Sequence, residues 1–145
     1  MKITLFADGA TRGNPGPSSA GVLLLNEKGE ELGEISKFLG TATNNQAEYA
    51  AVVFGLEKAL KLKATEVEIF LDSKLIVEQV SGRWKIKEVQ LKKAVEKVHA
   101  LLQKFSDWKI QHVPREKNSK ADALANRVLD LRGFKKKPAP FRRWQ

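Results

Sequence analysis

Two acidic residues come directly after apolar runs that are typical of buried strands. Residues 3–7 lead into Asp8, and residues 67–71 lead into Asp72. Residues 9–16, with three glycines and a proline, are expected to form a loop that allows close backbone approach. Two ordinary alternatives exist, because an Asp often opens a turn and an Asp before a Ser is typical of a helix start. The repeated arrangement favours a shared chemical role for the two carboxylates.

Two further acids stand near the starts of expected helices. Thr43 and Gln46 have the spacing of a capping box, which predicts a helix from there to about residue 62. Glu48 heads a mostly apolar stripe on this helix, and Asp122 repeats the arrangement on the last expected helix. Either acid could simply complement a helix dipole from the first turn. A buried carboxylate, however, needs a partner or a metal ion.

The order of the elements predicts an α/β fold with a mixed sheet and helices on its faces. A hairpin comes first and strands then alternate with helices, so the first, fourth and fifth strands are expected to be parallel. The expected strands after the first cover residues 20–25, 31–39, 67–71 and 108–113. The expected helices cover residues 43–62, 73–80, 89–105 and 119–131.

The carboxyl ends of parallel strands meet at one edge of a sheet, where the binding sites of such sheets form. Asp8 and Asp72 are expected at this edge, and the helices headed by Glu48 and Asp122 can reach it with their first turns. Four carboxylates would repel one another without cations. Oxygen ligands, with no cysteine in the chain and no histidine at hand, favour Mg²⁺ or Mn²⁺ over zinc. Two such ions, about 3.5–4 Å apart, suit in-line displacement at phosphorus.

Composition predicts one compact domain over residues 1–131, followed by a basic, mobile tail over residues 132–145. The tail contains six Lys or Arg residues and no acid, out of a net charge of +9 for the chain. The remaining +3 leaves the body only mildly basic, although the total favours a polyanionic partner. With no cysteine and no apolar run of membrane-spanning length, we expect a cytoplasmic protein without a membrane partner. A monomer is the default expectation for a domain of this size.

Several short motifs follow one another along the chain. They are Asp8-Gly9-Ala10, Arg12-Gly13-Asn14-Pro15-Gly16, Thr43-Asn44-Asn45-Gln46-Ala47-Glu48, Asp72-Ser73, His112-Val113-Pro114-Arg115-Glu116-Lys117-Asn118 and Ala121-Asp122-Ala123-Leu124-Ala125. Each motif alone is weak, whereas the set is highly specific. In this order, over residues 2–131, the set resembles the type 1 ribonuclease H family, and in particular its archaeal-like members.

The resemblance implies the ribonuclease H fold, a five-stranded mixed sheet with an antiparallel hairpin, parallel strands and flanking helices. It also implies an endoribonuclease that hydrolyses the RNA strand of RNA/DNA hybrids and leaves 5′-phosphate and 3′-hydroxyl ends. The catalytic residues and ligands of two Mg²⁺ or Mn²⁺ ions would be the four acids already singled out, Asp8, Glu48, Asp72 and Asp122.

The resemblance further implies a set of substrate-binding residues, Arg12, Gly13, Asn14, Thr43, Asn44 and Gln46. Most of these match positions that touch the minor groove of the hybrid, where 2′-hydroxyls distinguish RNA from DNA. Thr43 and Asn14 also match a pocket for a phosphate of the DNA strand, a role that suits short polar groups.

The chain departs from the family pattern in the loop before Asp122. Many members have a histidine there, whereas this chain has Arg115 and Glu116, and some archaeal-like members also lack the histidine. Arg115 could stabilise developing phosphate charge and Glu116 could handle protons, or both could be solvated loop residues. His112 lies back in a strand, where we expect it to be packed and hydrogen-bonded rather than catalytic.

Three functions remain open from the sequence. An endoribonuclease leads, a catalytically silent nucleic-acid-binding domain comes second, and a DNA nuclease of the same fold comes third. The intact acids disfavour the second, and the minor-groove residues disfavour the third. Activity on double-stranded RNA is left open. The link from Gly82 to Val89 is too short for an extra basic helix, so the basic tail is expected either to hold phosphates or only to solubilise the chain.

Overall fold

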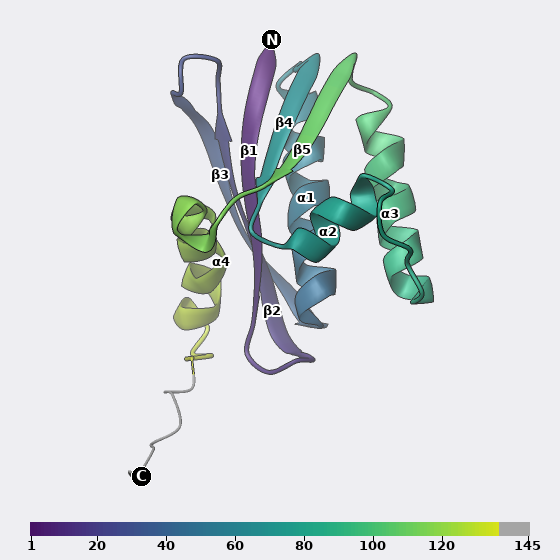
Figure 1. The fold of residues 1–145 in the computed structure, drawn as a ribbon. Helices are drawn as coiled ribbons and strands as arrows, with labels where there is room; N and C mark the ends of the chain where they lie inside the picture. The colour runs from purple at the N-terminus through teal and green to yellow at the C-terminus, as the bar shows by residue number, and fades with distance from the viewer. Residues whose placement is uncertain (137–145) are drawn as a thin grey trace.

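The computed structural model describes residues 1–136, which form one five-stranded sheet in the order β3-β2-β1-β4-β5 (Figure 1). The central strand β1 pairs antiparallel with β2 and parallel with β4, while β3 and β5 form the edges. The predicted mixed sheet is therefore confirmed. The strands are β1 (Lys2–Thr11), β2 (Gly16–Leu25), β3 (Glu31–Ala42), β4 (Glu66–Leu71) and β5 (Asp107–His112).

Helices cover both faces of the sheet, with α4 on one face and the other three on the opposite face (Figure 1). The helices are α1 (Asn44–Lys61), α2 (Lys74–Val80), α3 (Val89–Leu102) and α4 (Ser119–Leu131), with a short 3-10 helix η1 (Arg115–Lys117) before α4. The predicted capping box is confirmed, because the Thr43 hydroxyl accepts from the Gln46 amide and the Gln46 side chain accepts from the Thr43 amide. Ser73 caps α2, so the alternative of Asp72 as an N-cap is wrong.

The main core lies between the sheet and helices α1 and α3. It is built from alternate residues of β1, such as Ile3 and Leu5, which pack against buried residues of the two helices, such as Leu56 and Val98. A smaller cluster under α4 contains Ala10, Ala125 and Leu129. Because residues 3, 5 and 7 face α1, the side chains of Asp8 and Ala10 lie on the α4 side of the sheet.

β1 is longer than the sequence indicates, and the predicted loop over residues 9–16 is wrong for half of its length, because residues 9–11 belong to β1 and residue 16 to β2. Its parallel pairing with β4 ends at Phe6, whereas its antiparallel pairing with β2 continues to Thr11 opposite Ser18. The chain turns only over residues 12–15. Asp8 therefore lies inside a strand, at the point where the β4 side of that strand becomes open.

The first residues of the predicted tail pack against the sheet. The ring of Phe134 stacks on that of Phe38, with centroids 6.1 Å apart, and the Arg132 guanidinium lies 4.0 Å from the Phe38 centroid. The rest of the predicted mobile tail, residues 137–145, lies outside the described residues. Within the described residues, none of the helices combines the length and the apolar character needed to cross a membrane.

Candidate active site

Three of the four predicted acids meet at the open side of β1. Asp8 comes from β1, Glu48 from α1 and Asp72 from the end of β4, and one carboxylate oxygen of each lies within 4.8 Å of the other two. We call these three residues the acid cluster. Asp8 is 4% exposed and Glu48 9% exposed, so two of these carboxylates are almost removed from water.

Glu48 reaches Asp8 because α1 packs directly against the β1 backbone at Gly9. A Cβ at position 9 would lie 2.5 Å from the carbonyl carbon of Ala47 and 2.5 Å from the backbone nitrogen of Glu48, so only glycine fits this contact. Glu48 lies in the second turn of α1, and the alternative of a first-turn acid that complements the helix dipole is wrong for it.

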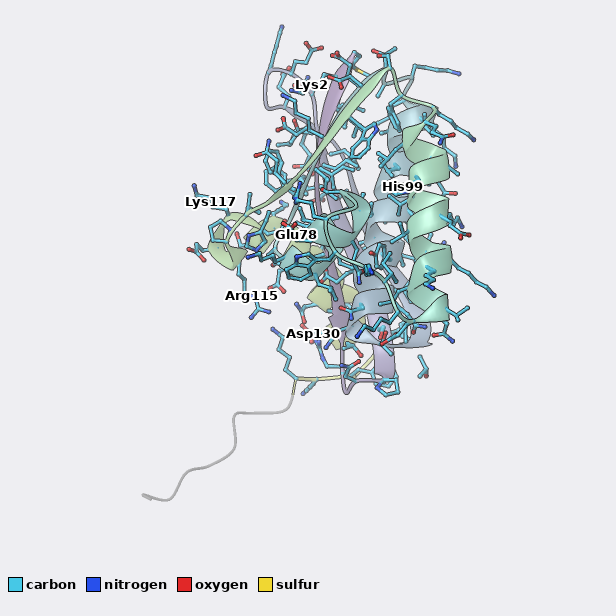
Figure 2. All side chains as sticks on the ribbon, turned by 45° about the vertical axis from the view of Figure 1, so that its right-hand side comes forward. Lys2, Glu78, His99, Arg115, Lys117 and Asp130 are labelled. Atoms are coloured by element: carbon cyan, nitrogen blue, oxygen red, sulfur yellow. The ribbon has the colours of Figure 1, made fainter. Side chains whose placement is uncertain are left out.

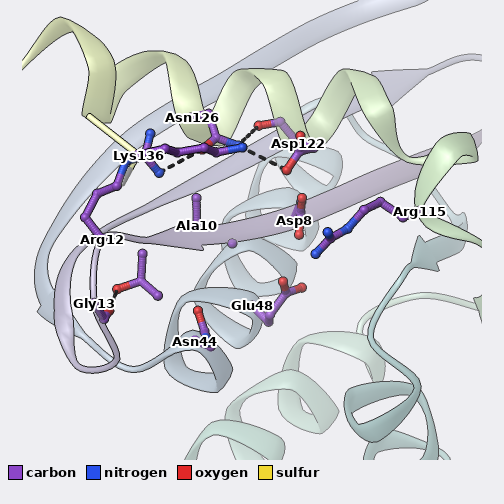
Figure 3. A pocket seen from close by; sticks show the side chains of 12 residues that line it. Asp8, Ala10, Arg12, Gly13, Asn44, Glu48, Arg115, Asp122, Asn126 and Lys136 are labelled. Carbon is purple, nitrogen blue, oxygen red and sulfur yellow. Dashed lines mark hydrogen bonds between the residues drawn. The ribbon is translucent and has the colours of Figure 1, made fainter. Parts of the chain in front are cut away.

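Asp122 lies in the first turn of α4, on the face of the sheet opposite to α1, from which Glu48 comes. It lines a cleft of about 540 Å³ together with Asp8 and Glu48 (Figure 3). The Asn126 side-chain amide, one turn further along α4, donates to the Asp122 carboxylate at 3.0 Å and to its backbone carbonyl at 2.9 Å. This pair of hydrogen bonds fixes the orientation of the fourth acid beside the acid cluster.

Burial and mutual repulsion disfavour the charged state of these acids. Burial raises the pKa of Asp8 above its ordinary value, and the neighbouring Glu48 raises it further. Burial also raises the pKa of Glu48, although a hydrogen bond with Asp8 and the Gly9 amide act in the opposite direction. Within residues 1–136, two buried carboxylate oxygens of these acids, Glu48 Oε2 and Asp72 Oδ2, have no hydrogen-bond partner.

A hard divalent cation fits this donor set. The ligand atoms are all carboxylate oxygens, which Mg²⁺ and Mn²⁺ prefer, and the unpartnered oxygens of Glu48 and Asp72 would gain the partner that the described residues do not supply. Bound positive charge would also favour the ionised form of Asp8 that burial disfavours. The acid cluster is therefore suited to bind metal and costs stability without it.

The loop before α4 contributes one cation to the cleft. Arg115 lines it and lowers the pKa of Glu48 by its charge, whereas Glu116 is exposed and does not belong to the cleft lining among the described residues. Arg115 and Lys117 project in different directions from η1 (Figure 2). His112 is exposed, so the expectation of a packed histidine is wrong.

Sequence reasoning missed two asparagines that hold the site together. The buried Asn118 donates from Nδ2 to the Ala7 carbonyl at 2.8 Å and so ties the start of α4 to β1 beside Asp8. Asn126 orients Asp122 as described above. An asparagine directly before a helix and another four residues after an acid were the available signals.

The predicted substrate-binding residues lie along the same side of the molecule and are largely engaged with one another. Gly13 and Asn44 line the cleft, and the Asn14 side chain accepts from the Asn44 amide at 3.0 Å. Thr43 and Gln46 form the capping box, and the Gln46 side-chain amide also donates to the Gln90 side-chain oxygen. These contacts fix the loop after β1 against the start of α1.

Arg12 differs from the other predicted substrate-binding residues because its guanidinium is used inside the protein. It donates to Asn126 Oδ1 at 2.8 Å, to Asp130 Oδ1 at 2.9 Å and to the Phe134 carbonyl at 2.7 Å. Its side chain is only 9% exposed. The structure thus gives Arg12 a structural role between β1 and the end of α4.

Comparison with known proteins gives relatives over most of the chain. A family described as reverse transcriptase-like matches residues 6–128. The bifunctional protein Rv2228c of Mycobacterium tuberculosis is 44% identical over 131 residues, which cover 90% of this chain and 36% of that protein. Ribonuclease HI of Halobacterium salinarum is 41% identical over 129 residues, which cover 89% of this chain and 65% of that protein. The chain thus spans between 36% and 65% of the length of these curated relatives.

Two solved structures have the same fold. RNase H1 from Halobacterium salinarum has a TM-score of 0.88 at 41% identity and covers 90% of this chain and 98% of its own. LC11-RNase H1, solved in complex with an RNA/DNA hybrid, has a TM-score of 0.84 at 40% identity, with coverage of 90% and 98%. Because the family match, the sequence relatives and the solved structures agree over most of its length, the chain belongs to the type 1 ribonuclease H family.

Proposed function

We propose that this chain is a metal-dependent endoribonuclease that hydrolyses the RNA strand of RNA/DNA hybrids. The observation that carries the proposal is the acid cluster, whose buried oxygens lack partners at the open side of β1. Family membership supports the reaction class, and the relative solved with an RNA/DNA hybrid supports the substrate class.

The four acids Asp8, Glu48, Asp72 and Asp122 would hold two Mg²⁺ ions, with Mn²⁺ as the alternative. When bound, such ions activate water and neutralise charge at phosphorus. Water would attack in line with the 3′ oxygen, so that the products carry 5′-phosphate and 3′-hydroxyl ends. Asn126 would keep the Asp122 carboxylate in its position during this reaction, because both of its amide hydrogen bonds go to that residue.

The residues of the chain itself would select and orient the substrate. Gly13 and Asn44 line the cleft beside the acids, where backbone and amide groups can meet the 2′-hydroxyls of an RNA strand. The Arg115 guanidinium faces the same cleft and would interact with a backbone phosphate. Arg12 would act mainly through structure, because each of its three guanidinium nitrogens already donates a hydrogen bond inside the protein.

Cleavage of end-labelled duplexes tests this proposal. RNA/DNA, RNA/RNA and DNA/DNA duplexes of one sequence are incubated with the protein and Mg²⁺, Mn²⁺ or EDTA, and the product ends are mapped. We expect metal-dependent cutting of the RNA strand within the hybrid, with 3′-hydroxyl products. Cutting of DNA/DNA would establish a DNA nuclease instead, and hybrid binding without cutting in either metal would establish a silent binding domain. The RNA/RNA duplex decides whether double-stranded RNA is also a substrate.

A further inference from the structure

The last described residues return to the cleft of the acid cluster. α4 ends at Leu131, and the segment that follows brings Lys136 to line the same cleft as Asp8, Glu48 and Asp122. In Figure 3, Lys136 lies at the Arg12 and Asn126 end of the cleft, while Arg115 lies on the other side of the carboxylates. Basic side chains therefore line the cleft on both sides of the acids, Arg115 on one side and Lys136 with Arg12 on the other.

The backbone and the ring of Phe134 hold this segment in place. The Phe134 carbonyl accepts from Arg12 Nε at 2.7 Å, and the Phe134 amide donates to the Leu129 carbonyl at 2.9 Å. Its ring stacks on Phe38 with an interplanar angle of 4°. The position of Lys136, two residues later, is thus set by an anchored backbone.

The Lys136 ammonium is available to a ligand. Among the ion pairs within residues 1–136, none involves Lys136, although the cleft that it lines contains three carboxylates. Since Lys136 does not pair with these acids, the acids and the ammonium can bind different parts of a ligand. The acids suit cations, whereas an unpaired ammonium at the end of the cleft suits a phosphate of a strand that lies across the acids.

We propose that Lys136 binds a backbone phosphate next to the one that is cleaved. This proposal rests on the proposed function and adds a specific substrate contact to it. Lys136 and Arg115 would hold the strand on the two sides of the acid cluster, so that the phosphate between them meets the four acids. Each contact would release counterions from the nucleic acid, which makes its contribution measurable through salt dependence.

The test compares Lys136→Ala with Lys135→Ala, since Lys135 is an exposed neighbour of equal charge that is not among the residues that line the cleft. The dissociation constant of a fluorescein-labelled RNA/DNA hybrid is measured by anisotropy in EDTA between about 50 and 300 mM KCl. Lys136→Ala should reduce the slope of log Kd against log salt by about 0.9 and raise Kd about fivefold to tenfold at about 0.1 M salt. Lys135→Ala should change Kd less than about twofold.

A second variant, Phe134→Ala, tests whether the anchored backbone delivers Lys136. It leaves the charge unchanged but removes the stacking on Phe38, so it should raise Kd in the same direction as Lys136→Ala. The double variant should be no weaker than Lys136→Ala alone, because both changes remove the same phosphate contact.

Two results would overturn the proposal. One is an equal loss from Lys135→Ala and Lys136→Ala, which would mean unspecific attraction by basic residues. The other is an unchanged salt slope in Lys136→Ala. Failure of the proposed function looks different, because the unmodified protein would then leave the RNA strand of the hybrid uncut with Mg²⁺ or Mn²⁺, which the binding measurement in EDTA does not test.

Discussion

Two polar sites lie only four residues apart, at Asp8 within β1 and at Arg12 directly after it, and they are built in opposite ways. At Arg12, three donors of one guanidinium each meet an acceptor, on Asn126, Asp130 and Phe134. We call these residues the arginine cluster. At Asp8, four residues earlier, carboxylates crowd together and two of their buried oxygens have no partner within residues 1–136.

The difference separates a structural role from a functional one. A buried charge whose nitrogens all donate to acceptors within the protein adds to the stability of the fold, and it gains little from a ligand. A buried charge without partners lowers the stability of the fold and gains from a ligand of opposite charge. Both groups were equally conspicuous in the sequence, as an Arg and an Asp in one glycine-rich stretch. Only their partners distinguish them.

The largest expected effect comes from removing a charge from the acid cluster. Asp72→Asn should lower kcat for hybrid cleavage by about 1000-fold or more, because metal-assisted stabilisation of several kcal/mol depends on its carboxylate. Binding of the hybrid in EDTA should change less than about threefold, since the amide keeps the size of the side chain. Single-turnover cleavage and anisotropy measure the two quantities. Retained turnover would remove Asp72 from the site.

The arginine cluster should respond in stability. Arg12→Leu should lower the free energy of unfolding by about 2–3 kcal/mol, because it leaves the Asn126 and Phe134 acceptors without their donor. Urea unfolding measures this change. Lys2→Leu is a matched control, since its ion pair with Glu68 is 40% exposed on the lysine side and contributes about 0–1 kcal/mol. Normal stability with a raised KM would instead make Arg12 a substrate contact.

A substitution in the acid cluster should change the free energy of unfolding in the opposite direction when metal is absent. Asp8→Asn should raise the free energy of unfolding in EDTA at pH 8 by about 1–2 kcal/mol, because a neutral amide replaces an acid that ionises freely in the unfolded chain at this pH and that burial and Glu48 keep from ionising in the folded protein. The same substitution should abolish cleavage. A gain in stability together with a loss of activity is the outcome that the comparison with Arg12 predicts.

The pH dependence of this gain follows from the raised pKa values. The folded protein holds protons on Asp8 and Glu48 more tightly than the unfolded chain does, so their contribution to stability is complete below about pH 4. It is lost as pH rises through the folded pKa of Glu48, which burial raises to about 7, and then that of Asp8, which burial and Glu48 raise to about 10. Unfolding in EDTA should therefore show falling stability between about pH 4 and pH 8. Added Mg²⁺ should restore more stability at pH 8 than at pH 5, and equal effects would argue against cation binding here.

The smallest expected effect concerns Asn126, which joins the two clusters. Asn126→Ala should lower kcat about tenfold, because Asp122 keeps its charge but loses the donor that orients it. Asp130→Asn serves as control, since it weakens only an ion pair whose carboxylate is 60% exposed. That control should leave kcat within about twofold of the unmodified protein. A similar loss in both variants would assign the effect to the arginine cluster as a whole.

The sequence was sufficient for the order of elements and for the meeting of three of the predicted acids. Apolar periodicity located the helices and strands, and the capping box of Thr43 and Gln46 located the start of α1 correctly. The meeting of Asp8, Glu48 and Asp72 followed from the rule that parallel strands end at one edge.

The rest depended on long-range contacts that local patterns do not encode. Asp8 lies inside a strand because β2 pairs with β1 as far as Thr11. His112 is exposed because it is the last residue of the edge strand β5. It shares a strand face with apolar residues, but at this position that face is not buried by the rest of residues 1–136. The hydrogen bonds of Arg12 could not be predicted because its acceptors, on Asn126 and Asp130, come more than a hundred residues later, and its assignment to the substrate by resemblance stays a prediction.

The close packing at Gly9 also bears on which ion the protein can accept. Mg²⁺ binds oxygen at about 2.0–2.1 Å and Ca²⁺ at about 2.3–2.6 Å, so the separation of the ligands selects between them by size. Asp8 is fixed on β1 and Glu48 on α1, and the distance between these elements is set where α1 meets the backbone of residue 9. A single methyl group at this position would move the helix outward and enlarge the space between the two carboxylates. The absence of one side chain thus sets how closely α1, and with it Glu48, approaches the strand that carries Asp8.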